Sequence, residues 1–268
     1  MSHERALPPS DSSFLSHYFK FNEYQTNFKK EMIAAFTTFI TMLYIVFVNP
    51  KILGDAGMDS QAIFVTTALI TAIACISMGI IAKLPIALAP GMGINAYFAY
   101  VLVGSMKLSW QTGMTLLFLS ASTLFLLSLF RIRYWMVANI PQSLRIGISS
   151  GCGLLITLIG LHNAGIIVAS PATMVTLGDP KEIGFILGSL SFLIVAVLAY
   201  RGNHASVMIS FVIITGIALI FDPSVKFHGL VSLPPSIRPV VGQFDFSEVF
   251  EFSMVGIIIS VMLINLFE

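Results

Sequence analysis

The chain has 268 residues, of which 56% are hydrophobic and 10% are charged, and its formal net charge is +1. Soluble domains carry about 25% charged residues, so this composition excludes an ordinary soluble enzyme and is typical of a polytopic membrane protein. The balanced charge gives no indication of nucleic-acid binding. The two cysteines, Cys75 and Cys152, lie in apolar runs. This indicates packing roles, and no disulfide framework, metal site or cofactor is predicted.

Residues 1–30 are polar and contain no apolar run long enough for a signal peptide. Aromatic residues between Phe14 and Tyr24 are interleaved with Lys20 and Glu23. This pattern predicts a short tail followed by a segment that lies at the membrane surface. The alternative is a partly disordered tail.

A helix of about twenty apolar residues crosses a bilayer. Eight stretches approach this length, at 31–48, 63–82, 84–103, 112–130, 146–168, 183–200, 206–221 and 250–268. The segment at 222–249 is the longest connection, and its prolines predict turns with short extended pieces. The sequence therefore predicts an all-α polytopic membrane protein with about eight transmembrane segments.

The distribution of basic residues predicts the orientation of these segments. If the N-terminus lies inside, nine lysine and arginine residues fall on the inner side and five fall on the outer side. Basic residues are enriched in cytoplasmic loops. We therefore expect a cytoplasmic tail over residues 1–30 and an extracytoplasmic loop over residues 222–249.

The stretch LPIALAPGMGINAYFAY at 84–100 is apolar but contains two prolines and two glycines. Pro90 disfavours a continuous helix, and Gly91 and Gly93 permit a break. Asn95 is a good N-cap residue, so we expect an extended segment followed by a half-helix that starts near it. Broken backbone survives in a bilayer only where protein buries it or where it lines a cavity, and transporters build substrate sites in this way. The alternative is a proline-kinked helix whose glycines serve packing.

Two short motifs resemble enzyme signatures but lack the required surroundings. The run at 91–96 matches the dinucleotide pattern GxGxxA, yet no acidic residue follows at the required distance. The run at 147–151 matches GxSxG, yet it opens an apolar stretch without a nearby histidine and acid. The sequence therefore does not favour an enzyme.

Several polar side chains follow the first apolar stretch. Three threonines lie at 37, 38 and 41, and in membrane helices such hydroxyls commonly bond to their own backbone. Tyr44 and Asn49 lie near the end of the stretch. They are the better candidates for lining a cavity.

The last stretch reaches Glu268 while still inside an apolar run. We expect the chain to be the N-terminal portion of a longer protein; the alternative is a charged terminus that reaches the interface. A carboxyl group at this depth is costly and is normally functional. Apolar surroundings favour its protonated form, which suits proton-coupled transport. Asn265 lies three residues earlier, on the same helix face.

Five runs of the sequence resemble one family of transporters. They are FTTFITMLYIVFVNPKIL at 36–53, ALAPGMGINAYFAY at 87–100, IPQSLRIGISSGCGL at 140–154, IGLHNAGIIV at 159–168 and MLINLFE at 262–268. These runs are similar to the AzgA-like purine permeases, a branch of the nucleobase–cation symporter superfamily. The resemblance extends from about residue 22 to residue 268.

The resemblance implies a fold of fourteen segments in two inverted repeats of seven. Residues 31–130 would form segments 1–4 of a core domain, and residues 131–221 would form segments 5–7 of a gate domain. Residues 250–268 would begin segment 8, which returns to the core. In this family the third and tenth segments each contain a short strand leading into a half-helix, and the purine binds between them.

The resemblance also implies roles for individual residues. Asn95 and Ala96 would lie at the half-helix start beside the base. Apart from the resemblance, Gly93 and Tyr44 are further candidates for contacting the substrate. Glu268 would contact the base and couple the proton. Many family members carry aspartate at the position of Asn265, so its role is left open.

The implied function is secondary active import of adenine, guanine or hypoxanthine by proton symport, with no enzymatic activity. The implied location is a bacterial inner membrane, where the partners are the purine, the proton and the lipid bilayer, and relatives suggest a homodimer. The alternative function is an ion or small-solute channel. A channel would use a ring of like charges or carbonyl groups, and the sequence contains no pattern for such a ring.

Overall fold

The computed structural model describes residues 14–21, 23–24, 26–84, 86–130, 132–171, 173–203, 205–222, 233–247, 249 and 251–267. Its helices are α1 Phe14–Tyr18, α2 Phe28–Met42, α3 Ile45–Asp55, α4 Ser60–Ser77, the π-helix η1 Met78–Ala82, α5 Met92–Ala96, the π-helix η2 Tyr97–Ser105, α6 Trp110–Leu129, α7 Ile132–Asn139, α8 Gln142–Asn163, α9 Ile183–Tyr200, α10 Ser206–Phe221 and α11 Phe252–Phe267. The strands β1 Ile167–Ser170 and β2 Met174–Leu177 form one antiparallel hairpin.

Five helical stretches of the described chain are long and apolar enough to cross a membrane. They are Phe28–Asp55, Ser60–Ala82, Trp110–Leu129, Gln142–Asn163 and Ile183–Tyr200. Three shorter apolar helices are Met92–Ser105, Ser206–Phe221 and Met254–Leu266. Each of the eight predicted stretches thus contains an apolar helix, and the all-α membrane class is confirmed.

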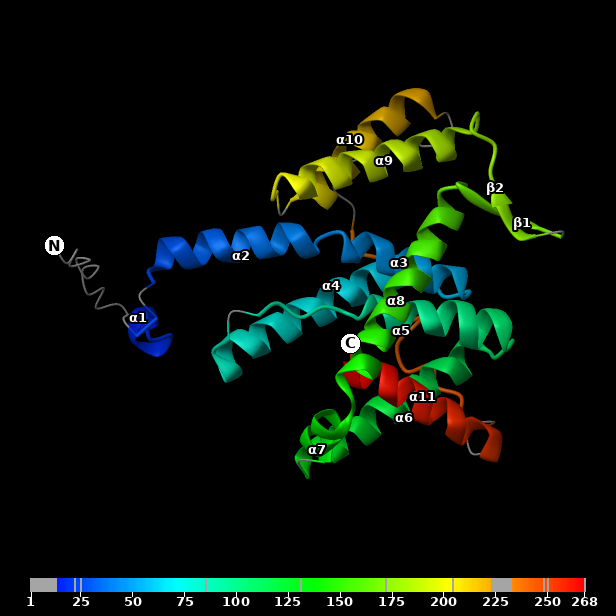
Figure 1. Cartoon of the computed structure of the whole chain (residues 1–268). Helices are drawn as coiled ribbons and strands as arrows, with labels where there is room; N and C mark the ends of the chain where they lie inside the picture. The colour runs from blue at the N-terminus through cyan, green and yellow to red at the C-terminus, as the bar shows by residue number, and fades with distance from the viewer. Residues whose placement is uncertain are drawn as a thin grey trace.

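The helices pack in pairs around a small central core. Helix α3 lies along α4, α6 lies against α11, and α9 lies against α10 (Figure 1). The central core joins α3, α4, η2 and α11 through the buried side chains Ile52, Ile63, Phe98, Leu102 and Val261. Residues far apart in the sequence therefore meet at the middle of the molecule.

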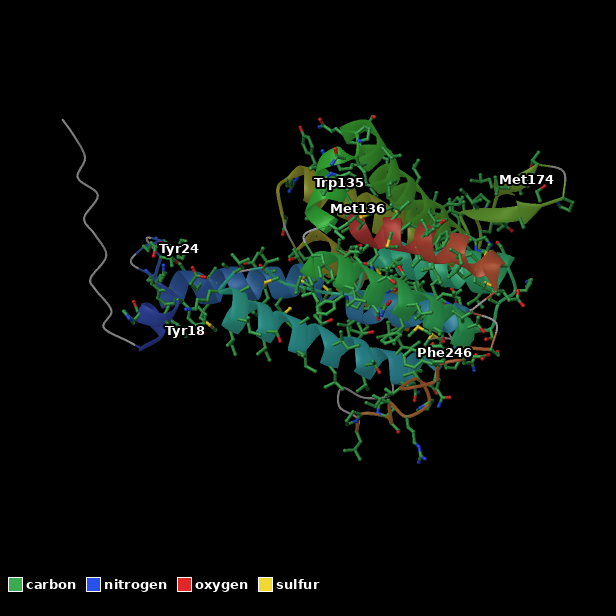
Figure 2. All side chains as sticks on the ribbon, turned by 90° about the horizontal axis from the view of Figure 1, so that it is seen from below. Tyr18, Tyr24, Trp135, Met136, Met174 and Phe246 are labelled. Carbon is green, nitrogen blue, oxygen red and sulfur yellow. The ribbon has the colours of Figure 1, made fainter. Side chains whose placement is uncertain are left out.

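The outward faces of the helices are strongly apolar. Phe36 of α2, Ile73 of α4 and Phe192 of α9 have exposed fractions of 62%, 64% and 73%. A soluble protein rarely exposes such continuous apolar surface, whereas lipid chains cover it without cost. Tyr18 and Tyr24 lie at one end of this body, and Met174 of the hairpin lies at the other end (Figure 2).

The fifth predicted stretch differs from the structure. We expected helix as far as residue 168, but α8 ends at Asn163 and the chain then enters the β1–β2 hairpin. Gly165 adopts a left-handed conformation (φ +70°) that stops the helix. Ile167 and Val168 then pair with Leu177 and Thr176, because β-branched residues suit a strand. The prediction of continuous helix was therefore wrong here.

The GxSxG run at 147–151 lies inside the continuous helix α8. A nucleophile elbow needs a sharp strand-to-helix turn at the serine. The structure therefore agrees with the rejection of that motif.

The first apolar stretch is interrupted between α2 and α3, at Leu43 and Tyr44. Pro50 inside α3 has no backbone N–H to donate to the preceding turn. The hydroxyls of Thr37 and Thr38 bond to carbonyls of their own helix at 2.8 and 2.9 Å, as expected. They therefore serve the backbone of α2.

Candidate functional site

The third apolar stretch is broken, as predicted. Helix η1 ends at Ala82, its C-cap Lys83 has a left-handed conformation (φ 53°), and the described residues from Leu84 to Gly91 are not helical. Gly91 is extended (φ −69°, ψ 124°) and directly precedes α5. The sequence thus produces a non-helical segment that leads into a short helix, which then continues as η2.

The predicted start of this half-helix was wrong by one turn. Helix α5 begins at Met92 with Gly91 as its N-cap, and no side chain caps it. The backbone N–H of Asn95 donates to the Gly91 carbonyl at 3.3 Å, so Asn95 already lies inside the helix. Glycine is tolerated at the N-cap, and the extended backbone imposed around Pro90 makes Gly91 the last non-helical residue.

Helix α4 holds the extended segment in place through a cysteine. The backbone N–H of Leu88 donates to Sγ of Cys75 at 3.2 Å. The thiol in turn donates to the Leu88 carbonyl at 3.2 Å. Both backbone polar groups of Leu88 are therefore satisfied, as broken backbone in a membrane requires.

The Asn95 side chain is held by a chain of hydrogen bonds that crosses three helices. Nδ2 of Asn95 donates to Oδ1 of Asn49 in α3 at 2.6 Å. Nδ2 of Asn49 donates to Oγ1 of Thr67 in α4 at 2.8 Å. The exposed fractions of Asn49 and Thr67 are each 3%, whereas Asn95 is half-buried. Buried polar networks of this kind orient their outermost member.

This arrangement leaves part of the Asn95 carboxamide available. One amide proton is donated to Asn49, and no other described residue hydrogen-bonds this side chain. The carbonyl oxygen and the second amide proton remain as an acceptor and a donor. An asparagine side chain can bind adenine through such a pair, by two hydrogen bonds to N6 and N7. The free donor and acceptor of Asn95 therefore have the chemistry to match the edge of a planar nitrogen heterocycle.

The other predicted site residues lie on three elements. Gly93 and Ala96 are buried within α5. Tyr44 is half-buried at the break between α2 and α3, and Asn265 is half-buried on α11, a helix that contacts α5. Among the described residues, no hydrogen bond joins Tyr44 or Asn265 to Asn95. Glu268 lies outside the described residues.

The sequence did not reveal the partners of Asn95. Asn49 was expected to line a cavity, but its amide is buried between Asn95 and Thr67. Its position before Pro50 in an apolar run was the only signal for a special role. Thr67 has neighbours of the same type in its helix, and nothing in the sequence distinguished it.

Comparisons with known proteins identify the chain as part of a larger family of transporters. It is 51% identical over 268 residues to the adenine permease AdeP of Escherichia coli K12, covering 100% of this chain and 60% of that protein. It is 53% identical over 259 residues to the adenine permease AdeQ of the same organism, covering 97% of this chain and 58% of that protein. It is 34% identical over 269 residues to the guanine/hypoxanthine permease PbuG of Bacillus subtilis, covering 94% of this chain and 60% of that protein.

The chain thus spans about 60% of the length of these relatives. The family model described as "Permease family" matches residues 29–268. This match includes the broken third stretch and the helices that hold Asn95. The chain belongs to the permease family.

Proposed function

We propose that this chain forms the first part of a secondary active transporter that imports purine nucleobases together with protons. Two relatives that are 51% and 53% identical are named adenine permeases, whereas a relative that is 34% identical is named a guanine/hypoxanthine permease. Adenine is therefore the first substrate to test. Membership of a permease family makes the protein a transporter and not an enzyme.

The observation that carries this proposal is the orientation of Asn95. Its amide is fixed by Asn49 and Thr67, so an incoming base meets a preformed acceptor and donor. Preformed contacts lower the entropy cost of binding. Gly93 and Ala96 carry little or no side chain, which lets a flat ring approach the start of the half-helix.

We assign proton coupling to Glu268, which would bond the base from the eighth apolar stretch. Its protonated hydroxyl can donate to a ring nitrogen, and its ionised form can accept from a ring N–H. Proton and base would then favour each other's binding, and such linkage is reciprocal. Tyr44 and Asn265 are proposed as further contacts to the substrate.

We place the protein in a bacterial inner membrane, with its N-terminus in the cytoplasm and a homodimer as its assembly. The inner position of most lysines and arginines supports this orientation. Membership of a permease family does not favour the channel alternative.

The test is uptake of labelled adenine by cells that lack their own purine uptake and express the full-length transporter of which we propose this chain is the first part. We expect saturable uptake that unlabelled adenine competes away and that a protonophore abolishes. Hypoxanthine and guanine as competitors would rank the substrates. Flux that does not saturate would indicate a channel, and the absence of uptake for all three purines would contradict the proposal.

A further inference from the structure

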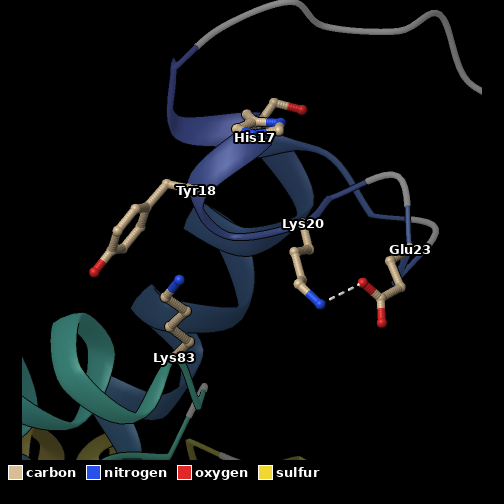
Figure 3. Close-up of a pocket in the computed structure, with 6 residues that line it drawn as sticks. His17, Tyr18, Lys20, Glu23 and Lys83 are labelled. Carbon is tan, nitrogen blue, oxygen red and sulfur yellow. Dashed lines mark ion pairs between the residues drawn. The ribbon is translucent and has the colours of Figure 1, made fainter.

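A surface hollow of about 510 Å³ lies where α1 meets the end of η1 (Figure 3). Its lining residues come from two parts of the chain about sixty residues apart. They are Ser16, His17, Tyr18, Lys20, Glu23 and Lys83. None of these residues takes part in the candidate substrate site.

Tyr18 joins the two parts of the chain at this hollow. Its hydroxyl donates to the carbonyl of Ile80 in η1 at 2.8 Å. The ammonium group of Lys83 lies over its ring, 4.2 Å from the ring centroid. Helix α1 is therefore fastened to the end of the second apolar helix, and the hollow between them is a formed feature of the fold.

The backbone is strained at both lysines of the hollow. Lys20 and Lys83 have φ angles of 55° and 53°, which residues with side chains rarely adopt. Among the described residues, only two other non-glycine residues, Lys107 and Met174, have positive φ. Both lysines lie just past a helix end, where a left-handed residue commonly stops the helix. In Figure 3 the ammonium group of Lys83 points toward Tyr18 of α1, and that of Lys20 points toward Glu23.

The charges of the hollow favour an anion. Lys20 pairs with Glu23 at 2.8 Å. Among the described residues, no carboxylate pairs with Lys83. Its ammonium group lies over the face of the Tyr18 ring. The two lysines and Glu23 therefore give the hollow a net positive charge.

Exposed apolar residues flank Lys83 in the chain. Ile80, Ile81 and Leu84 have exposed fractions of 53%, 81% and 47%. A soluble anion gains nothing from these side chains, whereas hydrocarbon chains do. We propose that the hollow binds the phosphate headgroup of an anionic phospholipid, between Lys20 and Lys83, with the acyl chains lying against η1.

The test is native mass spectrometry of the full chain, purified in detergent and titrated with phosphatidylglycerol or phosphatidylcholine. We expect the unaltered chain to bind one phosphatidylglycerol at least tenfold more tightly than phosphatidylcholine. The double variant Lys20→Gln/Lys83→Gln should lose this preference. Lys83→Arg should keep it, and Glu23→Gln should tighten binding because Lys20 loses its partner. If the unaltered chain binds both lipids with equal affinity, the proposal is overturned, whatever the variants do.

Lys107→Gln is the matched control, because Lys107 is also exposed and also has a positive φ (60°) but does not line the hollow. It should bind phosphatidylglycerol as the unaltered chain does. Thermal unfolding of each variant checks that it folds. Displacement of the lipid by millimolar inorganic phosphate would show that the hollow selects a free anion, and it would overturn the assignment to a lipid.

Discussion

Asn49 is the residue on which the orientation of Asn95 depends. It accepts from Asn95 and donates to Thr67, and it is almost completely buried. A buried amide without partners costs far more than an exposed one. Asn49 therefore fixes the Asn95 side chain without needing to touch the substrate.

We predict that Asn49→Ala weakens adenine uptake more than it weakens folding. The change removes the partner that Thr67 and Asn95 share, at a cost of about 1–3 kcal/mol. Where this cost falls on binding, each 1.4 kcal/mol lowers the apparent affinity for adenine roughly tenfold. Labelled adenine uptake measures the effect. Thr38→Ala is the control, since Thr38 bonds only to its own helix, at the Ala34 carbonyl. Unchanged apparent affinity in Asn49→Ala would remove Asn49 from the site.

Glu268→Gln tests the proposed proton coupling. Glutamine keeps the shape of the side chain and can still hydrogen-bond a base, but it cannot take up or release a proton. We expect this variant to retain some adenine binding and to lose accumulation driven by a pH gradient. Glu268→Asp should be milder. The measurement is adenine uptake into proteoliposomes with and without an inward proton gradient. If Glu268→Gln still accumulates adenine in response to the gradient, another group couples the proton.

Among the elements, the extended segment before α5 depends on one side chain of a neighbouring helix. The sulfur of Cys75 accepts a hydrogen bond from the Leu88 backbone N–H and donates one to the Leu88 carbonyl. The segment has no regular structure of its own to hold it. Its position is therefore set by α4.

We predict that Cys75→Ser preserves uptake and that Cys75→Ala reduces it. Serine can make both hydrogen bonds, whereas alanine leaves the Leu88 backbone without partners, at a cost of about 1–3 kcal/mol. Uptake and thermal unfolding of the purified chain measure the two effects. Equal behaviour of Cys75→Ser and Cys75→Ala would show that the segment is held by other contacts.

The segment at 233–247 is anchored to α6 by Asp245. Its backbone N–H donates to Oγ1 of Thr115 at 2.9 Å. The hydroxyl and backbone N–H of Ser247 donate to its Oδ1 at 2.6 and 3.0 Å and hold the pKa of this carboxyl below its usual value. The Phe118 and Phe244 rings pack beside this anchor, with centroids 5.1 Å apart.

This anchor predicts a pH dependence of stability. Because the folded pKa of Asp245 lies below the unfolded one, the ionised carboxylate stabilises the fold above the unfolded pKa. That contribution is lost as the pH falls through the folded pKa, below about pH 4. Asp245→Asn should therefore flatten the decline of the unfolding temperature below that pH. The measurement is thermal unfolding in detergent from pH 3 to pH 7, and parallel curves for both proteins would contradict the prediction.

At the scale of the whole molecule, helix α6 packs closely against η2. Phe98 is completely buried, and a Cβ added at Gly113 would lie 2.7 Å from its Cε2 atom. Only glycine lets these two elements approach this closely. The contact supports η2 directly behind the half-helix that carries Asn95.

We predict that Gly113→Ala destabilises the chain by roughly 1–3 kcal/mol, because overpacking forces the Phe98 ring or the backbone to move. Gly216→Ala on α10 is the control, since an added Cβ there meets no atom within 4 Å. It should be neutral or slightly stabilising, because alanine is the better helix former. Thermal unfolding of the two variants in the same detergent measures the difference, and equal unfolding temperatures would show that Phe98 adapts without cost.

The sequence alone determined the class of the protein and the position of its break. Apolar stretches of membrane-spanning length follow from composition, because lipid selects for continuous hydrophobicity. The break near Gly91 follows from local chemistry, since Pro90 and the glycines restrict or release the backbone wherever they occur. The hairpin after Gly165 escaped prediction because its short apolar strand reads like the end of a membrane helix.

Only the tertiary structure decided what Asn95 does. The residue type suits an N-cap, but the helix starts earlier and the side chain turns to Asn49. That bond joins residues 46 positions apart, and the next one joins Asn49 to Thr67. Such pairings depend on how α3, α4 and α5 pack together, and no local pattern in the sequence records them. The hollow between Lys20 and Lys83 has the same origin, because it exists only where α1 docks on η1.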